Sequence, residues 1–176
     1  DSVELQAAYF RNDFSNLIAV GSIAGGGTPL SQGKALFEGV EFSALAELNG
    51  GAFGRLAYTW LPTAEQTEVF RNVASGALVG VQGNRQPYSP RHTLTAAMGY
   101  KAGSVKAELE AQHVGQQFSD FANSSAPAAN GQTGSLASYT VWNTTFNQQL
   151  HPRLAAFVTA KNLFDSTYIV DRSRGI

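Results

Sequence analysis

The chain has 176 residues, a formal net charge of −1 and no cysteine. The near-neutral charge excludes the basic surface that nucleic-acid binding requires, and the lack of cysteine excludes a disulfide scaffold, a thiolate metal site and a cysteine nucleophile. Hydrophobic residues make up 43% of the sequence, yet no stretch approaches the ~20 consecutive apolar residues of a transmembrane helix. Any contact with a membrane is therefore expected to be made by strands.

Apolar and polar residues alternate with period two along most of the chain, which predicts an all-β fold. We expect strands at residues 2–20, 34–49, 52–61, 91–101, 104–118, 136–148 and 153–164. Asn49-Gly50-Gly51 is a tight hairpin signal between the second and third of them. All six prolines fall outside these strand interiors, where a missing N–H would break a ladder. The N-terminus lacks the features of a signal peptide, so a mature or truncated chain is expected.

The connections between these strands alternate in length. Long ones at residues 21–33, 62–90 and 119–135 alternate with short ones near residues 49–51, 101–104 and 149–152. Transmembrane barrels show this alternation, with short periplasmic turns and longer extracellular loops. The pattern predicts an antiparallel up-and-down meander of about seven long strands, a partial transmembrane β-barrel whose chain begins at the periplasmic side. The small, polar residues of 119–135 are expected to form a flexible tip.

The strand faces agree with a membrane barrel. Ala107, Leu109 and Ala111 alternate with Glu108 and Glu110, as expected for lipid on one side and a wet lumen on the other. Leu94 and Ala96 should join the lipid-facing set. Aromatic residues are expected at two levels, as in interfacial girdles: Trp60, Tyr88, Phe118 and Tyr139 on the outer side, and Phe53, Tyr100 and Phe146 on the inner side.

The end of the chain carries a recognisable motif. Residues 162–168 read Asn-Leu-Phe-Asp-Ser-Thr-Tyr, which resembles the Asn-Leu-Phe-Asp-x-x-Tyr signature on the penultimate strand of TonB-dependent receptors. Upstream, Gly39-Val40-Glu41 looks like a family strand start, and residues 87–92 (Pro-Tyr-Ser-Pro-Arg-His) are similar to its Pro-Tyr-x-Pro-x-His pattern. Residues 70–73 and 168–176 look most like the ferric-dicitrate subgroup.

This resemblance implies that residues 1–176 are the C-terminal portion of a receptor barrel of about 22 strands, with the plug domain and the final strand absent. Such a receptor lies in the bacterial outer membrane, binds a ferric chelate (a siderophore or dicitrate) outside the cell and imports it with energy from TonB. The implied partners are the chelate, outer-membrane lipid and lipopolysaccharide, and TonB through the missing plug; no nucleic acid is expected.

Loop arginines are the candidate ligand contacts, because guanidinium forks suit the carboxylates of an anionic chelate. The candidates, all in expected outer loops or the C-terminal segment, are Arg71, Gln82, Arg85, Arg172 and Arg174. Solvation of the loops, or contact with lipopolysaccharide phosphates, is the alternative role.

Catalysis finds no support in the sequence, so no enzyme, catalytic residue, cofactor or resident metal is expected. His92 and His113 are expected near the outer rim on neighbouring strands, where an interfacial role is weighed against a metal site. Glu108 and Glu110 are read as lumen lining rather than acid/base machinery. Two other classes stay open: a complete small outer-membrane barrel with a structural or adhesive role, and a soluble β-sandwich binding module.

Overall fold

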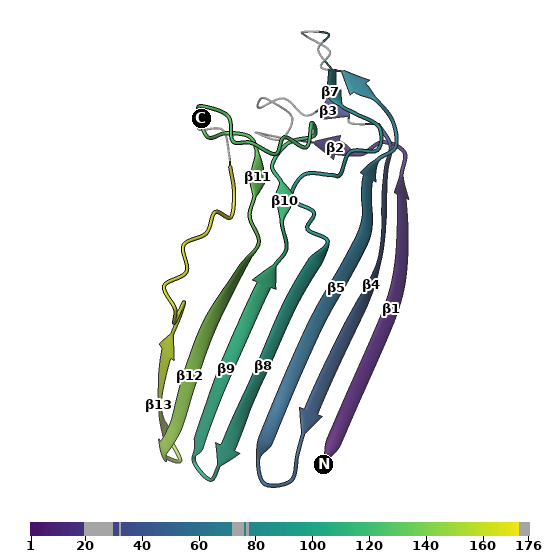
Figure 1. Ribbon diagram of the computed structural model, residues 1–176. Coiled ribbons are helices and arrows are strands. Elements are labelled where there is room, and N and C mark those ends of the chain that lie inside the picture. Colours follow the sequence, from purple (N-terminus) through teal and green to yellow (C-terminus); the bar gives the residue numbers. More distant parts are fainter. Residues whose placement is uncertain (20–29, 32, 72–75, 77, 173–176) are drawn as a thin grey trace.

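The structure is a computed structural model that describes residues 1–19, 30–31, 33–71, 76 and 78–172 (Figure 1). Within these residues no helix is long and apolar enough to cross a membrane.

One antiparallel sheet dominates the fold, and its seven strands follow one another in chain order. The expected seven-stranded meander is therefore confirmed. The strands are β1 (Ser2–Phe14), β4 (Ala35–Glu47), β5 (Ala52–Gln66), β8 (His92–Ala102), β9 (Val105–Val114), β12 (Tyr139–His151) and β13 (Leu154–Ala160). Three short ribbons extend the long connections: β2 (Ile18–Ala19) with β3 (Leu30–Ser31), β6 (Phe70–Arg71) with β7 (Leu78–Gly80), and β10 (Gln117–Phe118) with β11 (Ser135–Leu136).

The short turns all lie at one end of the sheet and the long connections at the other (Figure 1). Gly50 and Gly51 have φ of 93° and 96°, and Gly103 has φ of 55°. Residues with side chains rarely adopt these values, so the glycines permit hairpins this tight. The predicted alternation of long and short connections therefore places the turns and the loops at opposite ends of the sheet.

Strand β5 is longer than expected and contains Pro62, contrary to the prediction that every proline lies outside a strand. The register between β4 and β5 shifts between Glu38 and Val40, where Thr63 and Trp60 are their partners. Leu61 and Pro62 therefore occupy a β-bulge, one of the few places in a sheet where a missing N–H is tolerated.

Four other strands are shorter than predicted at their outer ends by three residues or more. Strand β1 stops at Phe14, β9 stops at Val114, β12 begins only at Tyr139, and β13 stops at Ala160. The Asn-Leu-Phe-Asp motif consequently lies just beyond β13 and not within it. Asn162 and Asp165 have positive φ of 53° and 49°, and the Asn162 side chain accepts from Ser166 N at 2.9 Å and donates to Ser166 O at 3.2 Å. The asparagine closes a turn that ends the strand.

Paired residues show that the two faces of the sheet differ chemically. Leu94 pairs with His113, Ala96 with Ala111 and Met98 with Leu109, and paired residues share a face. Arg55, Glu108, Glu110, Asn143 and Thr145 lie on the other face, together with most of the sheet's polar side chains. We call these the apolar face and the polar face.

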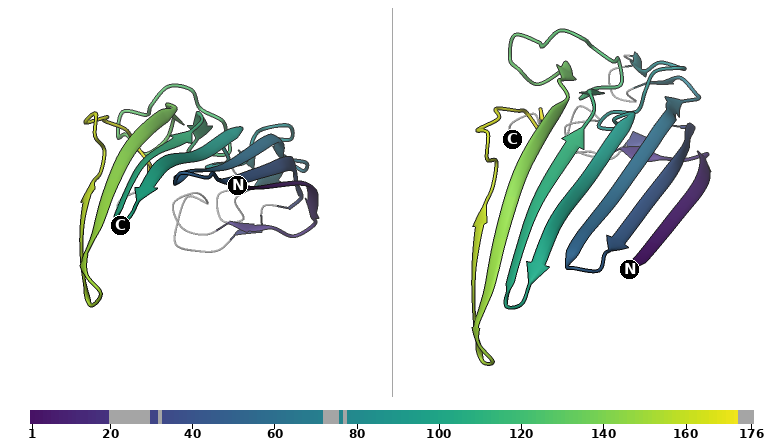
Figure 2. Two further views of the ribbon diagram at one scale, coloured as in Figure 1. Left: turned by 90° about the horizontal axis from the view of Figure 1, so that it is seen from below. Right: turned by 60° about the horizontal axis from the view of Figure 1, so that its bottom comes forward.

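The sheet is curved, and its polar face is the concave one. Seen along the strands, the ribbon forms an arch (Figure 2). Three hollows along the sheet are each lined by polar-face residues, among them Glu108 in the first, Glu47 in the second and Gln6 in the third. A wall that is apolar outside and polar inside is what a transmembrane barrel requires.

Apolar-face side chains are exposed to a degree unusual in a water-soluble protein. Met98 is 68% exposed, Leu5 64% and Val158 68%. The single layer of seven paired strands has no second sheet packed on it among the described residues, which rules out the β-sandwich. Because β1 and β13 stand at the two edges of the open sheet, the described chain does not close a small barrel either.

The aromatic residues follow the expected two levels only in part. Trp60 lies near the outer end of the apolar face, and Tyr100 and Phe146 lie near its inner end. Phe53 is on the polar face, where the Lys106 ammonium lies 4.6 Å from its ring centroid. Tyr139 stacks on Tyr168, with ring centroids 4.3 Å apart. Phe53 and Tyr139 are therefore on the polar face, away from lipid.

Candidate functional site

Several of the most buried side chains among the described residues lie in the outer connections or at the strand ends beside them. Phe121 is 4% exposed and Leu136 is 1% exposed. The polar side chains of Gln66 and Gln86 are also buried, and they form a hydrogen bond with each other at 2.8 Å. Among the described residues of the sheet, the buried apolar ones are Ala35 and Ala64, near the outer ends of β4 and β5, and Ala97 and Val141. The outer connections are thus a folded body, here called the loop cap, comprising residues 81–91, 115–138 and 161–172.

Asn123 joins two connections of the loop cap. Its Oδ1 accepts from Arg85 N at 2.7 Å, and its Nδ2 donates to Arg85 O at 2.8 Å. Asp120 accepts from the backbone amides of Ser124 and Gly134. These bonds and the burial of Phe121 give segment 119–135 a defined structure, whereas the sequence analysis expected only a flexible tip.

Arg85 is the most constrained of the predicted site residues. It is 8% exposed, and its guanidinium donates to three backbone carbonyls: Ser89 at 2.6 Å, Leu61 at 2.6 Å and Pro62 at 3.1 Å. Burial, and next the nearby charge of Arg91, lower the pKa of Arg85 to about 10. The side chain ties the loop cap to the bulge of β5.

The other predicted residues lie in different surroundings. Arg71 is exposed and donates to Gly76 O at 3.1 Å, and Gln82 is exposed in a turn. Arg172 is half-buried and donates from Nη1 to Gly131 O at 3.1 Å. Arg174 lies outside the described residues. Arg85 and Arg172 are thus brought into one loop cap, on different partners.

Tyr88 links the C-terminal segment to the rest of the loop cap. Its hydroxyl donates to Asp171 Oδ1 at 2.5 Å and accepts from Arg172 N at 3.3 Å, while its backbone amide donates to Phe118 O at 2.8 Å. Burial, and next the bond to Asp171, raise the pKa of Tyr88 to about 12. The side chain of Tyr88 therefore links segment 161–172 to residues 81–91, and its backbone links these to residues 115–138.

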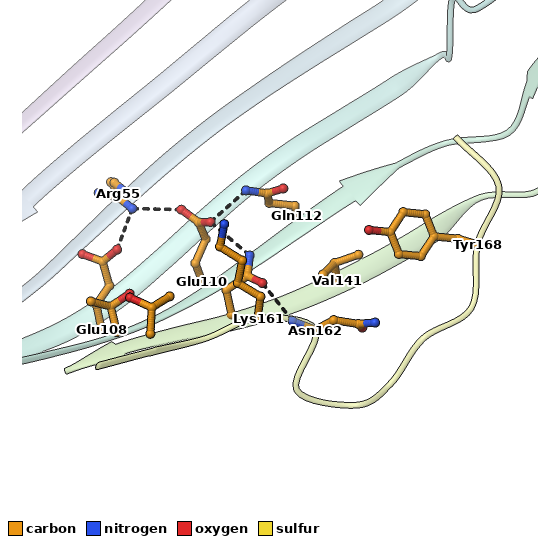
Figure 3. Close-up of a pocket in the computed structure, with 11 residues that line it drawn as sticks. Arg55, Glu108, Glu110, Gln112, Val141, Lys161, Asn162 and Tyr168 are labelled. Atoms are coloured by element: carbon orange, nitrogen blue, oxygen red, sulfur yellow. Dashed lines mark hydrogen bonds and ion pairs between the residues drawn. The ribbon is translucent and has the colours of Figure 1, made fainter. Parts of the chain in front are cut away.

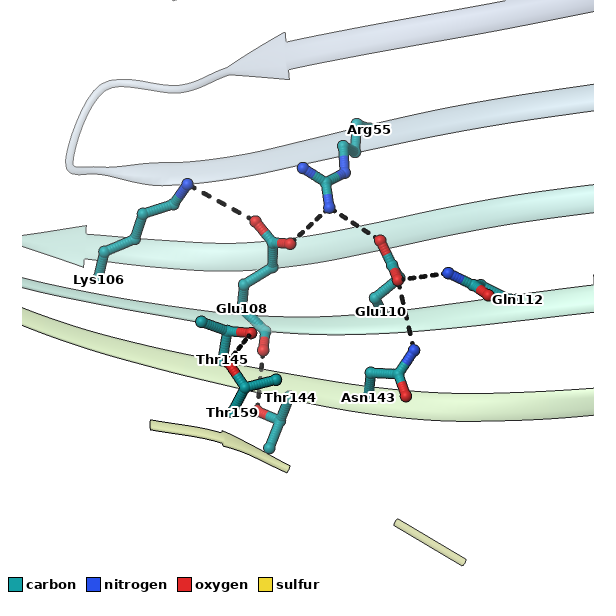
Figure 4. A network of polar contacts seen from close by, with 9 residues as sticks. All are labelled: Arg55, Lys106, Glu108, Glu110, Gln112, Asn143, Thr144, Thr145 and Thr159. Atoms are coloured by element: carbon teal, nitrogen blue, oxygen red, sulfur yellow. Dashed lines mark hydrogen bonds and ion pairs between the residues drawn. The ribbon is translucent and has the colours of Figure 1, made fainter. Parts of the chain in front are cut away.

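The polar face carries a second group of functional side chains, centred on Arg55 (Figures 3 and 4). Arg55 Nη2 lies 2.6 Å from Glu108 Oε1 and 2.9 Å from Glu110 Oε2. Lys106 Nζ lies 3.6 Å from the other oxygen of Glu108, and Gln112 donates to Glu110 at 2.8 Å. The cluster lines an open hollow of about 440 Å³, which also meets Asn143, Lys161 and Tyr168.

Sequence reasoning expected Glu108 and Glu110 to line the lumen, and they do lie on the polar face, but it missed Arg55. The arginine comes from β5 and reaches β9 across the intervening β8, where the residues beneath it are Ala97 and Gly99. The small side chains leave room for the crossing. A prediction of the strand register could have found this contact, because it would place Arg55 two strands from Glu108 and Glu110 with only small side chains between them.

The two histidines expected at the outer rim are each bonded to a hydroxyl group. Within the described part of the chain, no group of three or more His, Asp or Glu side chains is placed to hold a metal ion. His92 and His113 do lie at the outer ends of neighbouring strands, as expected. Each ring bonds a hydroxyl through Nδ1, with Tyr58 at 2.8 Å and Thr140 at 2.9 Å.

Comparison with known families agrees with the geometry. A family model described as "TonB dependent receptor-like, beta-barrel" matches residues 1–163.

Solved structures share the fold at low sequence identity. The siderophore receptor PiuA from Acinetobacter baumannii superposes with a TM-score of 0.75 at 21% identity, over 96% of this chain and 23% of that one. The ferric citrate transporter FecA in its unliganded form gives 0.71 at 23% identity, over 94% and 25%. The ferric yersiniabactin uptake receptor FyuA from Yersinia pestis gives 0.68 at 22% identity, over 96% and 23%. The chain thus spans about a quarter of the length of the proteins it matches.

Proposed function

Because the chain belongs to the TonB-dependent receptor β-barrel family, we propose that it forms one section of the wall of an outer-membrane receptor that binds a ferric chelate outside the cell and takes part in its TonB-energised uptake. Family members are transport receptors of the Gram-negative outer membrane, not enzymes. The observation that carries the proposal is the wall itself, with an exposed apolar face, a polar concave face and every long connection at one end.

The remaining parts of the receptor belong to the same proposal. A plug domain and a final barrel strand are expected elsewhere in the whole protein, and TonB is expected to act through the plug. Lipid and lipopolysaccharide are the proposed partners of the apolar face. The solved relatives include receptors or transporters for a siderophore, ferric citrate and ferric yersiniabactin, which supports a ferric chelate as the substrate class.

Ligand contact is proposed for the outer residues that keep accessible polar groups. Arg71 and Gln82 are exposed, and Arg172 reaches the surface of the loop cap; Arg174 follows it in the sequence. Arg85 was a further candidate, but its three carbonyl partners and burial support a bracing role within the cap.

The test replaces Arg71, Gln82, Arg172 or Arg174 by Ala in the full-length receptor and measures binding of labelled ferric citrate to whole cells. A charge-assisted hydrogen bond contributes ~1.5–3 kcal/mol, so an arginine that contacts the chelate should raise its Kd roughly ten- to a hundredfold when lost. Surface abundance, measured by antibody, is the control. Wild-type binding by all four variants would refute these contacts, while loss of binding for a neutral hydroxamate chelate as well would argue against recognition by charge.

A further inference from the structure

A hollow outside the barrel wall lies where the apolar face ends. Glu65 and Arg85 form an antiparallel bridge, so their side chains share one face. Glu65 pairs with Leu36, which in turn pairs with Asp13, and Asp13 is on the same side of β1 as Val3, Leu5 and Tyr9. Glu65 and Arg85 are therefore on the apolar face, beyond its outer end.

Glu65 and Arg85 line this hollow together with aromatic residues at the outer edge of the apolar face. His92 pairs with Trp60, and its ring is stacked on Tyr58 with centroids 6.1 Å apart. The hollow has a volume of about 450 Å³ and is lined by Glu65, Arg85, Arg91, His92, Gln116 and Phe118, among others. It sits at the level where aromatic side chains of barrels meet the lipid headgroups.

Two cations converge in this hollow. Arg85 Nη1 and Arg91 Nη1 both donate to the carbonyl of Pro62, at 3.1 Å and 2.9 Å, so the two guanidinium groups are neighbours. Glu65 is the one carboxylate among the lining residues, and the pair therefore leaves a net positive charge there. The lowered pKa of Arg85, caused by burial and by Arg91, is the effect expected of a buried cation beside another cation.

Both guanidinium groups have donors to spare for a ligand. A guanidinium carries five N–H groups, and Arg85 makes three bonds to carbonyls among the described residues. Arg91 makes one such bond and is exposed. Arg85 thus forms a fixed wall of the hollow, while Arg91 is the guanidinium group that a ligand can reach from solvent.

We propose that the hollow between Arg85, Arg91 and His92 binds the phosphate group of a phosphorylated lipid of the outer leaflet. Paired guanidinium groups match the oxygens of a phosphate bidentately, and the site opens beside the apolar face, where acyl chains lie against Leu94 and Trp60. A free anion in water would meet the same charges but would gain nothing from the adjacent apolar surface. The proposal rests on the outer-membrane orientation of the wall and not on the identity of the chelate.

The experiment uses the full-length receptor, purified in detergent and titrated with bis-phosphorylated lipid A, with dephosphorylated lipid A, or with inorganic phosphate, and monitored by native mass spectrometry. Arg91→Gln removes the accessible cation and leaves the bonds of Arg85 in place. Arg153→Gln is the matched control, because Arg153 is an exposed arginine in the turn between β12 and β13, at the opposite end of the wall. Arg91→Lys tests whether a charge alone suffices.

The wild type should retain the phosphorylated lipid at least tenfold more tightly than the dephosphorylated one, and Arg91→Gln should lose most of that preference while Arg153→Gln keeps it. Equal retention of both lipids, or equal losses in the two variants, would overturn the proposal. Displacement of the lipid by millimolar phosphate would also overturn it, in favour of a free-anion site. Ferric citrate binding by Arg91→Gln should match wild type. A wild-type receptor that binds the chelate but shows no preference for the phosphorylated lipid would refute this inference and leave the proposed function standing.

Discussion

Removing Arg55 should loosen the barrel wall measurably. The Arg55→Met variant keeps the length of the side chain but leaves Glu108 and Glu110, which are 14% and 20% exposed, without their shared cation. Two charge-assisted bonds of this kind contribute up to ~1.5–3 kcal/mol each when well shielded. Because the Arg55 side chain is 47% exposed, solvent screening brings the pair closer to surface values of ~0–1 kcal/mol each.

Both carboxylates also keep other partners in the variant. Lys106 stays near Glu108, and Gln112 and Asn143 still donate to Glu110. We therefore expect Arg55→Met to lower the free energy of unfolding by about 1–2 kcal/mol. The measurement is urea denaturation of the full-length receptor folded in lipid vesicles, followed by tryptophan fluorescence.

A double-mutant cycle separates the bridge from general effects of the substitution. Glu110→Gln combined with Arg55→Met should be less destabilising than the sum of the two single changes, by about 0.5–1 kcal/mol. Arg153→Met, in the exposed turn between β12 and β13, supplies the control for losing an arginine. If Arg55→Met shifts the denaturation midpoint no more than Arg153→Met does, and the cycle closes without coupling, the bridge does not brace the wall.

Two further predictions concern orientation and pH. Spin labels at positions 108 and 109 of the full-length receptor in vesicles should differ, with the label at Leu109 the more accessible to oxygen because it faces lipid; equal values or the reverse order would reject the assignment of faces. Tyr88 has a pKa raised from 10.0 to about 12, so its bond to Asp171 stabilises the loop cap fully below about pH 10 and is lost as the pH rises through about 12. Tyr88→Phe should therefore speed amide exchange in the loop cap by the same factor at every pH from about 6 to 9, because Tyr88 stays protonated throughout that range. The difference in tyrosinate absorbance between wild type and variant reports the pKa of Tyr88. If it titrates near the ordinary tyrosine pKa, the buried geometry is wrong.

The wall was predictable because its determinants are local. Alternation along residues 106–112 fixes which side chains share a face, and Asn49-Gly50-Gly51 fixes a turn without reference to the rest of the chain. The bulge at Pro62 was not predictable in the same way. It depends on the register between β4 and β5, and on the two arginines that bind the Pro62 carbonyl.

The site was harder to predict than the wall, for a related reason. Charge and loop position drew attention to Arg85 and Arg172, but not to their partners, since Ser89, Leu61 and Gly131 contribute only backbone carbonyls. Arg55 was missed because its contacts cross a whole strand. Such contacts become visible only when the order of strands and the sizes of the intervening side chains are known together.

The position of the buried residues has a consequence for how this chain tolerates change. Phe121 and Leu136 are shielded by protein, so trimming them should cost the same whatever surrounds the molecule. Leu5, Met98 and Val158 are largely exposed in the described part of the chain, so the stabilisation that each of their apolar atoms contributes depends on the bilayer. The stability of the wall therefore depends on the lipid around it, whereas the stability of the loop cap depends on protein packing. A change in membrane thickness or composition can thus favour substitutions in the wall without affecting those in the loop cap.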